Sequence, residues 1–98
     1  MSRLGDLESG HGCYYPVPVV SSVGTVLVNK IPAAAVGDIT SSHTCPKKPT
    51  HIDMISIGSK TVFVNKKSSA RIGDVLKSLG PGGPAVMAQG SHSVLAGG

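Results

Sequence analysis

A fourteen-residue segment occurs twice in this chain, and this internal repeat limits the possible folds more than any other feature. The first copy spans residues 25–38, TVLVNKIPAAAVGD, and the second spans residues 61–74, TVFVNKKSSARIGD. Eight of the fourteen aligned pairs are identical, at a spacing of 36 residues. A partial third copy covers residues 90–95, and a further Gly-Asp pair stands at 5–6. A period of this length predicts supersecondary units that stack on their neighbours.

Each copy has the composition of a short β-hairpin. Residues 25–28 and 61–64 are β-branched or apolar, as is typical of strands. The pairs at 29–30 and 65–66 begin with Asn, which tolerates the left-handed conformation that a tight turn needs. No segment keeps a helical period, and residues 74–79 are expected to form one helical turn at most. The predicted fold class is therefore all-β.

Length and composition predict one domain, residues 1–98, with a thin core. The chain has no Trp and only three aromatic residues, and a chain this short buries only about 60–65% of its unfolded surface. Such a domain usually needs a metal, a disulfide or a partner chain to be stable. The net charge of +4 comes from scattered lysines without interleaved aromatics, so nucleic-acid binding is not expected.

The sequence has neither a membrane-spanning apolar run nor the apolar core of a signal peptide. We therefore expect synthesis in the bacterial cytoplasm without a signal peptide. In that reducing compartment, the two cysteines are expected to be thiols or metal ligands.

Three of the five carboxylates recur in the repeated Gly-Asp pairs, as Asp6, Asp38 and Asp74. A catalytic carboxylate would not need to recur once per repeat. We interpret these residues as turn formers whose side chains accept backbone N–H groups.

Histidine and cysteine follow two of these pairs at matching positions. The register Gly-Asp-x-x-Ser-x-His-x-Cys ends at His11 and Cys13 in the first copy and at His43 and Cys45 in the second. It lapses after the third Gly-Asp pair, and His51 lies six residues beyond Cys45. Because stacked repeats place equivalent residues at equivalent heights, His11 and His43 should converge at one end of the molecule.

We predict that one structural Zn²⁺ per chain is bound by His11, His43, Cys45 and His51. Zinc takes four N or S ligands in a tetrahedron, and a closed site contributes folding energy directly. A His-x-Cys pair on an extended segment directs both side chains to one side, so His43 and Cys45 can share the ion. Cys13 remains an alternative to Cys45, and a Cys13–Cys45 disulfide is a further alternative.

Together these residues resemble the PAAR-repeat family, whose members sit on type VI secretion and phage-tail spikes. The resemblance covers nearly the whole chain and is carried by residues 58–65 (GSKTVFVN), 32–38 (PAAAVGD), 69–74 (SARIGD) and 9–14 (SGHGCY). The last of these is most similar to the phage-tail branch. Neither copy carries the Pro-Ala-Ala-Arg name motif intact.

This resemblance implies a small conical fold of short β-hairpins with pseudo-threefold repeats and a zinc-stapled apex. The base of such a cone caps the blunt end of a trimeric β-helical spike, either VgrG-like or a phage central spike, with one cone per trimer. The expected function is that of a membrane-piercing tip, located at a virion tail baseplate or an injection apparatus, with effectors as further partners. From alternation we expect the apolar base to use Val26, Val28, Val62, Val64 and, beyond these, Val94 and Leu95.

The resemblance also leaves the fourth ligand open. Many family members place a Cys shortly after the third Gly-Asp pair, but residues 75–80 contain none. His92 falls in a polar turn of the partial third copy and is interpreted as a surface residue.

Two alternatives differ in the class of function. The first is a stand-alone zinc-binding interaction module. The second is a metallohydrolase, which needs an open zinc position and a general base. Only Glu8 and Asp53 remain as carboxylates outside the Gly-Asp pairs, so we do not expect an enzyme.

Overall fold

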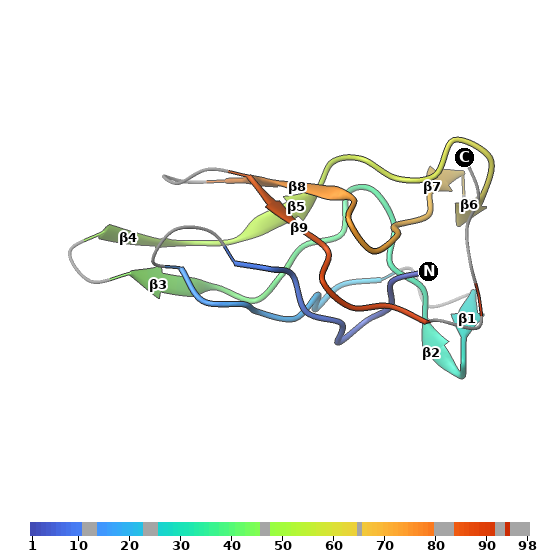
Figure 1. The fold of residues 1–98 in the computed structure, drawn as a ribbon, viewed down its shortest axis with the longest axis horizontal. Coiled ribbons are helices and arrows are strands. Elements are labelled where there is room, and N and C mark those ends of the chain that lie inside the picture. The colour runs from blue at the N-terminus through green and yellow to red at the C-terminus, as the bar shows by residue number, and fades with distance from the viewer. Residues whose placement is uncertain are drawn as a thin grey trace.

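The chain folds into short antiparallel strands that lie along an axis of 39 Å, with widths of 23 and 21 Å (Figure 1). The computed structural model describes residues 1–10, 14–22, 26–45, 48–64, 66–79, 84–91 and 94. The strands are β1 (Leu27–Val28), β2 (Ile31–Pro32), β3 (His43–Cys45), β4 (Lys48–His51), β5 (Asp53–Ile55), β6 (Phe63–Val64), β7 (Lys67–Ser68), β8 (Val75–Ser78) and β9 (Ala85–Val86).

The two ends of the long axis are built from different hairpins. The β3–β4 hairpin lies at one end, which we call the β3/β4 end, and the β1–β2 and β6–β7 hairpins lie at the opposite, β1/β6 end (Figure 1). The sheet of β5, β8 and β9 lies between them. The described ranges contain no helix, and so they contain no helix that could span a membrane. The all-β prediction is confirmed.

The two hairpins at the β1/β6 end lie in the repeated segments, but their first strands begin two residues later than predicted, at Leu27 and Phe63. Between β1 and β2, Asn29 and Lys30 both have positive φ, at 53° and 67°. Between β6 and β7, Lys66 has φ of 68°. Left-handed residues at the tip of a two-residue turn match the right-handed twist of the strands that they join.

Residues 74–79, for which the sequence allowed one helical turn at most, contain no helix. Residues Val75–Ser78 form β8, which pairs with β5 on one side and β9 on the other. The Leu76 side chain is fully buried between these neighbours. A central strand gains hydrogen bonds along both edges, and these outweigh a local preference for a helical turn.

A closed ring of backbone hydrogen bonds joins the three repeats. The Ala34 N–H donates to the Ser2 carbonyl (3.0 Å), the Ala70 N–H to the Ala34 carbonyl (3.0 Å), and the Ser2 N–H to the Ala70 carbonyl (2.8 Å). All three residues are fully buried. Their small side chains allow the three backbones to approach one another. The ring defines a pseudo-threefold axis through the chain.

The Gly-Asp pairs close three equivalent turns around this ring. In each turn an aspartate oxygen accepts the N–H of the residue three positions earlier, and the glycine before it has positive φ. The N–H to Oδ2 distances are 2.8 Å from Arg3 to Asp6, 2.9 Å from Ala35 to Asp38 and 2.7 Å from Arg71 to Asp74. The glycine φ values are 88° at Gly5, 97° at Gly37 and 91° at Gly73. The aspartates therefore have the turn-forming geometry that the sequence predicted.

The third unit is assembled from two segments that are far apart in the sequence. The Met1 amino group donates to the Val94 carbonyl (2.6 Å), and the Ser91 N–H donates to the Met1 carbonyl (2.9 Å). The second unit has the same pattern within one continuous segment, where Ser69 donates to Val62 (3.0 Å) and accepts from Ser59 (2.8 Å).

Two buried clusters form the core. One contains Val19, Ala34, Ile55, Ala70, Leu76 and Met87, and the other contains Met1, Val28, Ala33, Ala35 and Val64. Alternation had placed Val28 and Val64 on the base surface, and this is wrong because both side chains are buried. Their neighbours Leu27 and Phe63 are the exposed ones, at 58% and 56%. Leu95 lies outside the described residues.

We expect Asp74→Ala to lower the free energy of unfolding by about 1–3 kcal/mol, because the Arg71 N–H and guanidinium lose their acceptor. Asp74→Asn keeps one side-chain oxygen and should lose less. Urea denaturation measures the free energy of unfolding of both variants. The control is Lys77→Ala, at an exposed position on β8, which should change this free energy by less than about 0.5 kcal/mol. Equal stabilities of Asp74→Ala and the control would refute the turn role.

Candidate metal centre

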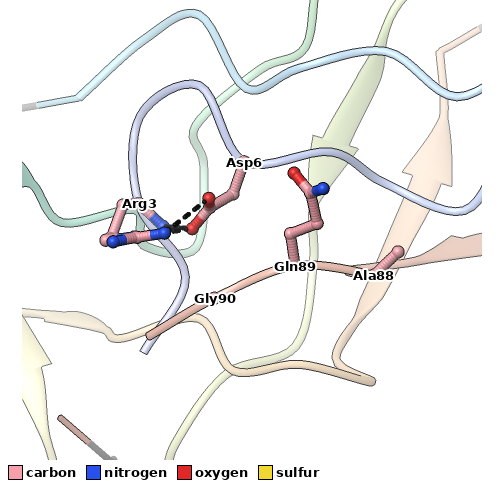
Figure 2. A pocket seen from close by; sticks show the side chains of 5 residues that line it. All are labelled: Arg3, Asp6, Ala88, Gln89 and Gly90. Carbon is pink, nitrogen blue, oxygen red and sulfur yellow. Dashed lines mark hydrogen bonds and ion pairs between the residues drawn. The ribbon is translucent and has the colours of Figure 1, made fainter. Parts of the chain in front are cut away.

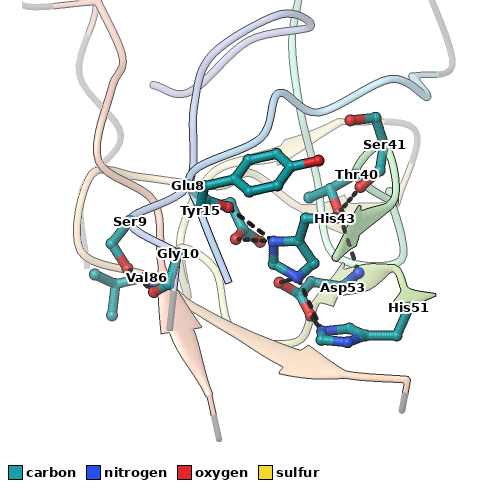
Figure 3. A network of polar contacts seen from close by, with 10 residues as sticks. All are labelled: Glu8, Ser9, Gly10, Tyr15, Thr40, Ser41, His43, His51, Asp53 and Val86. Atoms are coloured by element: carbon teal, nitrogen blue, oxygen red, sulfur yellow. Dashed lines mark hydrogen bonds and ion pairs between the residues drawn. The ribbon is translucent and has the colours of Figure 1, made fainter. Parts of the chain in front are cut away.

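The β3–β4 hairpin brings two buried histidines face to face. His43 and His51 are cross-strand partners at the open end of this hairpin. Their Nε2 atoms lie 2.9 Å apart, and the two side chains are almost wholly shielded from solvent (Figure 3). The Tyr14 ring packs against both imidazoles, with centroid distances of 4.9 Å to His43 and 4.3 Å to His51. The pair is thus covered by an apolar ring.

A backbone carbonyl fixes the tautomer of His43. Its Nδ1 lies 2.9 Å from the Tyr15 carbonyl oxygen (Figure 3). Because a carbonyl only accepts, Nδ1 must carry the hydrogen. In the neutral ring, Nε2 then carries a lone pair that is directed at His51 Nε2. Metal-binding histidines are commonly oriented by a hydrogen bond of this kind.

Asp53 completes a group of three donors. Its Oδ1 lies 3.0 Å from His51 Nε2, and its Oδ2 lies 3.3 Å from His43 Nε2. The residue opens β5, and its N–H donates to the Thr40 hydroxyl (3.1 Å), which holds the backbone in place. Sequence reasoning missed Asp53 as a ligand. The available signal was its position two residues after His51, where an extended chain returns a side chain to the same face.

Glu8 is a second buried carboxyl beside this group. Its side chain is fully buried, with Oε1 3.6 Å from His43 Nδ1. Within the described residues, neither oxygen of this carboxyl group has a hydrogen-bond partner. Burial, reinforced by the neighbouring Asp53 carboxyl group, raises the pKa of Glu8 to about 9. In the absence of a cation, the surroundings therefore favour the protonated, uncharged form of this carboxyl group.

The donor set fits a divalent transition metal ion. Two ligands at about 2.0–2.1 Å from a tetrahedral zinc ion lie about 3.3 Å apart. The two Nε2 atoms lie 2.9 Å apart, and each lies 3.0 or 3.3 Å from a different oxygen of Asp53. One ligand atom from each of the three residues lies within 4.8 Å of the others, so the group could hold one ion. Imidazole nitrogen and carboxylate oxygen are both common zinc ligands.

The remaining histidines and cysteines of the sequence fall where the structure gives no side-chain positions. His11, Cys13 and His92 lie outside the described residues, and only the backbone of Cys45 is described. The strand pairing shifts register between His43 and Cys45. The prediction that the His43 and Cys45 side chains point to one side assumed regular alternation, and this shift interrupts that alternation.

A cavity of about 340 Å³ lies apart from this centre. It is lined by Arg3, Asp6, Ala88, Gln89 and Gly90 (Figure 2). Its polar groups have internal partners, because Arg3 pairs with Asp6 at 3.0 Å and the Gln89 side-chain oxygen accepts the Leu7 N–H at 3.0 Å. Its lining shares no residue with the histidine–aspartate group.

Comparison with known proteins gives one match. A family model described as PAAR motif matches residues 9–78, which is more than half of the chain and includes His43, His51 and Asp53. A search of the curated proteins found no match.

We expect the purified protein to contain about one metal ion per chain, and chelation to lower the melting temperature. His43→Ala and Asp53→Asn should both lower the metal content, whereas His92→Ala should retain it. Elemental analysis and thermal unfolding with and without chelator measure these effects. A metal content unchanged by Asp53→Asn would remove Asp53 from the ligands, and one unchanged by His43→Ala would refute the centre.

In the chelated protein, stability should fall as the pH rises from about 5 to about 9. Over this range folded Glu8 keeps a proton that the unfolded chain, with a pKa of 4.5, has released. Glu8→Gln removes this proton difference, so its free energy of unfolding should depend less steeply on pH. Urea denaturation at pH 6, 7.5 and 9 gives both slopes, and equal slopes would contradict the raised pKa.

Proposed function

We infer from the family match that this chain, which belongs to the PAAR-motif family, is a spike-tip protein of a contractile injection system. We propose that it caps the blunt end of a trimeric β-helical spike, with one cone per trimer. The location would be a phage tail baseplate or the tip of a type VI secretion apparatus. Residues 1–98 would form one domain, made in the bacterial cytoplasm without a signal peptide.

The backbone ring of Ser2, Ala34 and Ala70 carries this proposal. A pseudo-threefold axis can be aligned with the threefold axis of a trimer, so that each repeat meets one partner chain. Leu27 and Phe63 occupy equivalent positions in their repeats. The carbonyl of the residue before each, Val26 or Val62, accepts the N–H of Ala33 or Ser69, respectively. Leu95 is the equivalent residue in the third copy of the sequence.

The β1/β6 end is the surface that we assign to the spike. Leu27 and Phe63 stand exposed on the short strands β1 and β6 at this end (Figure 1). A blunt β-helix end presents unpaired backbone groups and apolar interior residues. Short strands with outward apolar side chains can cover such an end by β-augmentation.

We assign a structural Zn²⁺ to the opposite, β3/β4 end. His43 and His51 would bind it together with His11, and the fourth ligand would be Cys45 or Asp53, with Cys13 as the remaining candidate. Zinc would supply folding energy there by tying β3, β4 and the segment before Tyr14 together. Such a tie resists the separation of these segments when the tip is driven into a membrane.

The role so described is mechanical, and we infer that the chain is not an enzyme. A site with four protein ligands leaves no position for a substrate or an activated water. Tyr14, which is 3% exposed, covers the histidine pair. Effectors would be accommodated beside the tip and not within this site.

We expect the chain to co-elute with a trimeric spike protein encoded beside it at one copy per trimer. Leu27→Ser and Phe63→Ser together should weaken this complex at least tenfold, because two exposed apolar contacts become polar. The control is Leu79→Ser, which changes a residue that is 47% exposed and whose backbone N–H donates to the Ile52 carbonyl, near the β3/β4 end.

Size-exclusion chromatography with light scattering gives the stoichiometry, and titration gives the affinity. A chain that binds metal but no trimer would instead be a stand-alone zinc-binding interaction module. Equal effects of the double variant and the control would reject the β1/β6 end as the contact surface.

A further inference from the structure

The fold places every carboxylate side chain of this protein in its interior. The sequence has five, and all of them lie in the described ranges. Their exposed fractions are 6% for Asp6, 0% for Glu8, 8% for Asp38, 0% for Asp53 and 6% for Asp74. The side-chain charge that reaches solvent is therefore positive.

Three cationic side chains are engaged by these acids. Arg3 pairs with Asp6 and Arg71 pairs with Asp74, at 3.0 and 2.9 Å. In the second repeat an alanine replaces this arginine, and the Lys67 ammonium lies beside Gly37, next to Asp38. These three groups serve the Gly-Asp turns.

The remaining described lysines that are exposed gather mostly at the β1/β6 end. Lys30 stands at the tip of the β1–β2 turn and Lys66 at the tip of the β6–β7 turn, while Lys60 lies just before β6 (Figure 1). All three are exposed, and no described ion pair includes them. Lys77, on β8, is the one described exposed lysine placed elsewhere.

The same turns carry the exposed apolar side chains of this end. Leu27 lies three residues before Lys30, and Phe63 lies three residues before Lys66. The repeat thus builds one unit twice, with an outward apolar residue on the first strand and a lysine at the turn. These units therefore present exposed apolar side chains and exposed lysines at the same end, and no exposed carboxylate side chain neutralises the lysines.

We propose that the β1/β6 end binds a spike whose blunt face carries carboxylates around an apolar centre, paired with Lys30, Lys60 and Lys66. This inference rests on the proposed function and adds the chemistry of the partner. Pairs of opposite charges would speed the association of the chain with the spike and fix their relative orientation, while the apolar contacts would supply most of the binding free energy. The attraction is screened by salt, over about 10 Å at 0.1 M ionic strength.

An anionic lipid surface is the other occupant to consider. Polybasic lipid-binding segments usually contain about 4–8 clustered Lys or Arg residues. The described part of this end has four exposed lysines; Lys67 lies beside Gly37 and Asp38, and of the other three, Lys30 and Lys66 occupy equivalent turns of two repeats. This arrangement favours a protein face of threefold symmetry.

The test measures the rate of association between the full chain and its encoded trimeric spike at 25, 100 and 400 mM salt. The wild-type rate should fall at least tenfold across this range. Lys30→Glu with Lys66→Glu should lower the rate at 25 mM salt about tenfold or more and flatten its salt dependence. Lys30→Gln with Lys66→Gln should lie between, and Lys77→Glu should change the rate less than twofold.

Each outcome has a separate meaning. A wild-type rate independent of salt, or double variants equal to Lys77→Glu, would overturn the charge inference and leave the proposed function standing. Absence of binding at every salt concentration would reject the proposed function itself. Binding to phosphatidylglycerol vesicles that the double Glu variant abolishes, with unchanged trimer binding, would assign these lysines to lipid and overturn the inference. Melting temperatures confirm that every variant is folded.

Discussion

Three hydrogen bonds between backbone groups of Ser2, Ala34 and Ala70 hold the repeats together, and the remaining elements are arranged about this closed ring. Each segment donates once and accepts once, so displacing any one of them would leave a buried N–H and a buried carbonyl without partners. The ring admits only small side chains at its centre. It also explains how a chain with three aromatic residues is ordered, since its long-range connections are made largely by the backbone and by buried turn aspartates.

The repeat predicted the hairpins and turns well because these depend on local chemistry. Asn29 marks the tight turn of the first copy, and the glycine of each Gly-Asp pair marks a positive φ. Alternation failed to identify the outward face of β1 and β6, because a strand of two residues has too few positions to show a pattern. The strand Val75–Ser78 was missed because its partners, β5 and β9, are remote in the sequence.

Sequence reasoning about the candidate centre succeeded only in part, for a related reason. His43 and His51 were singled out by residue type and register, and the hairpin pairs them directly. Asp53 was weighed only as a carboxylate that could serve a metallohydrolase and not as a metal ligand, although its distance of two residues from His51 placed it on the same side. The register shift inside β3 follows from how β4 pairs with it, and the sequence of β3 alone does not reveal it.

The exposed side-chain charge of this protein is positive because its five acidic side chains are buried. Three carboxylates are needed inside the Gly-Asp turns, and the other two lie beside the histidine pair at the opposite end from the lysine-tipped hairpins. Glu8 and Asp53 are therefore buried with the imidazoles near β3 and β4, whereas Lys30 and Lys66 are exposed at the turns beyond β1 and β6. Both lysines have positive φ, so the same turns that form the hairpins place these two cations at the hairpin tips.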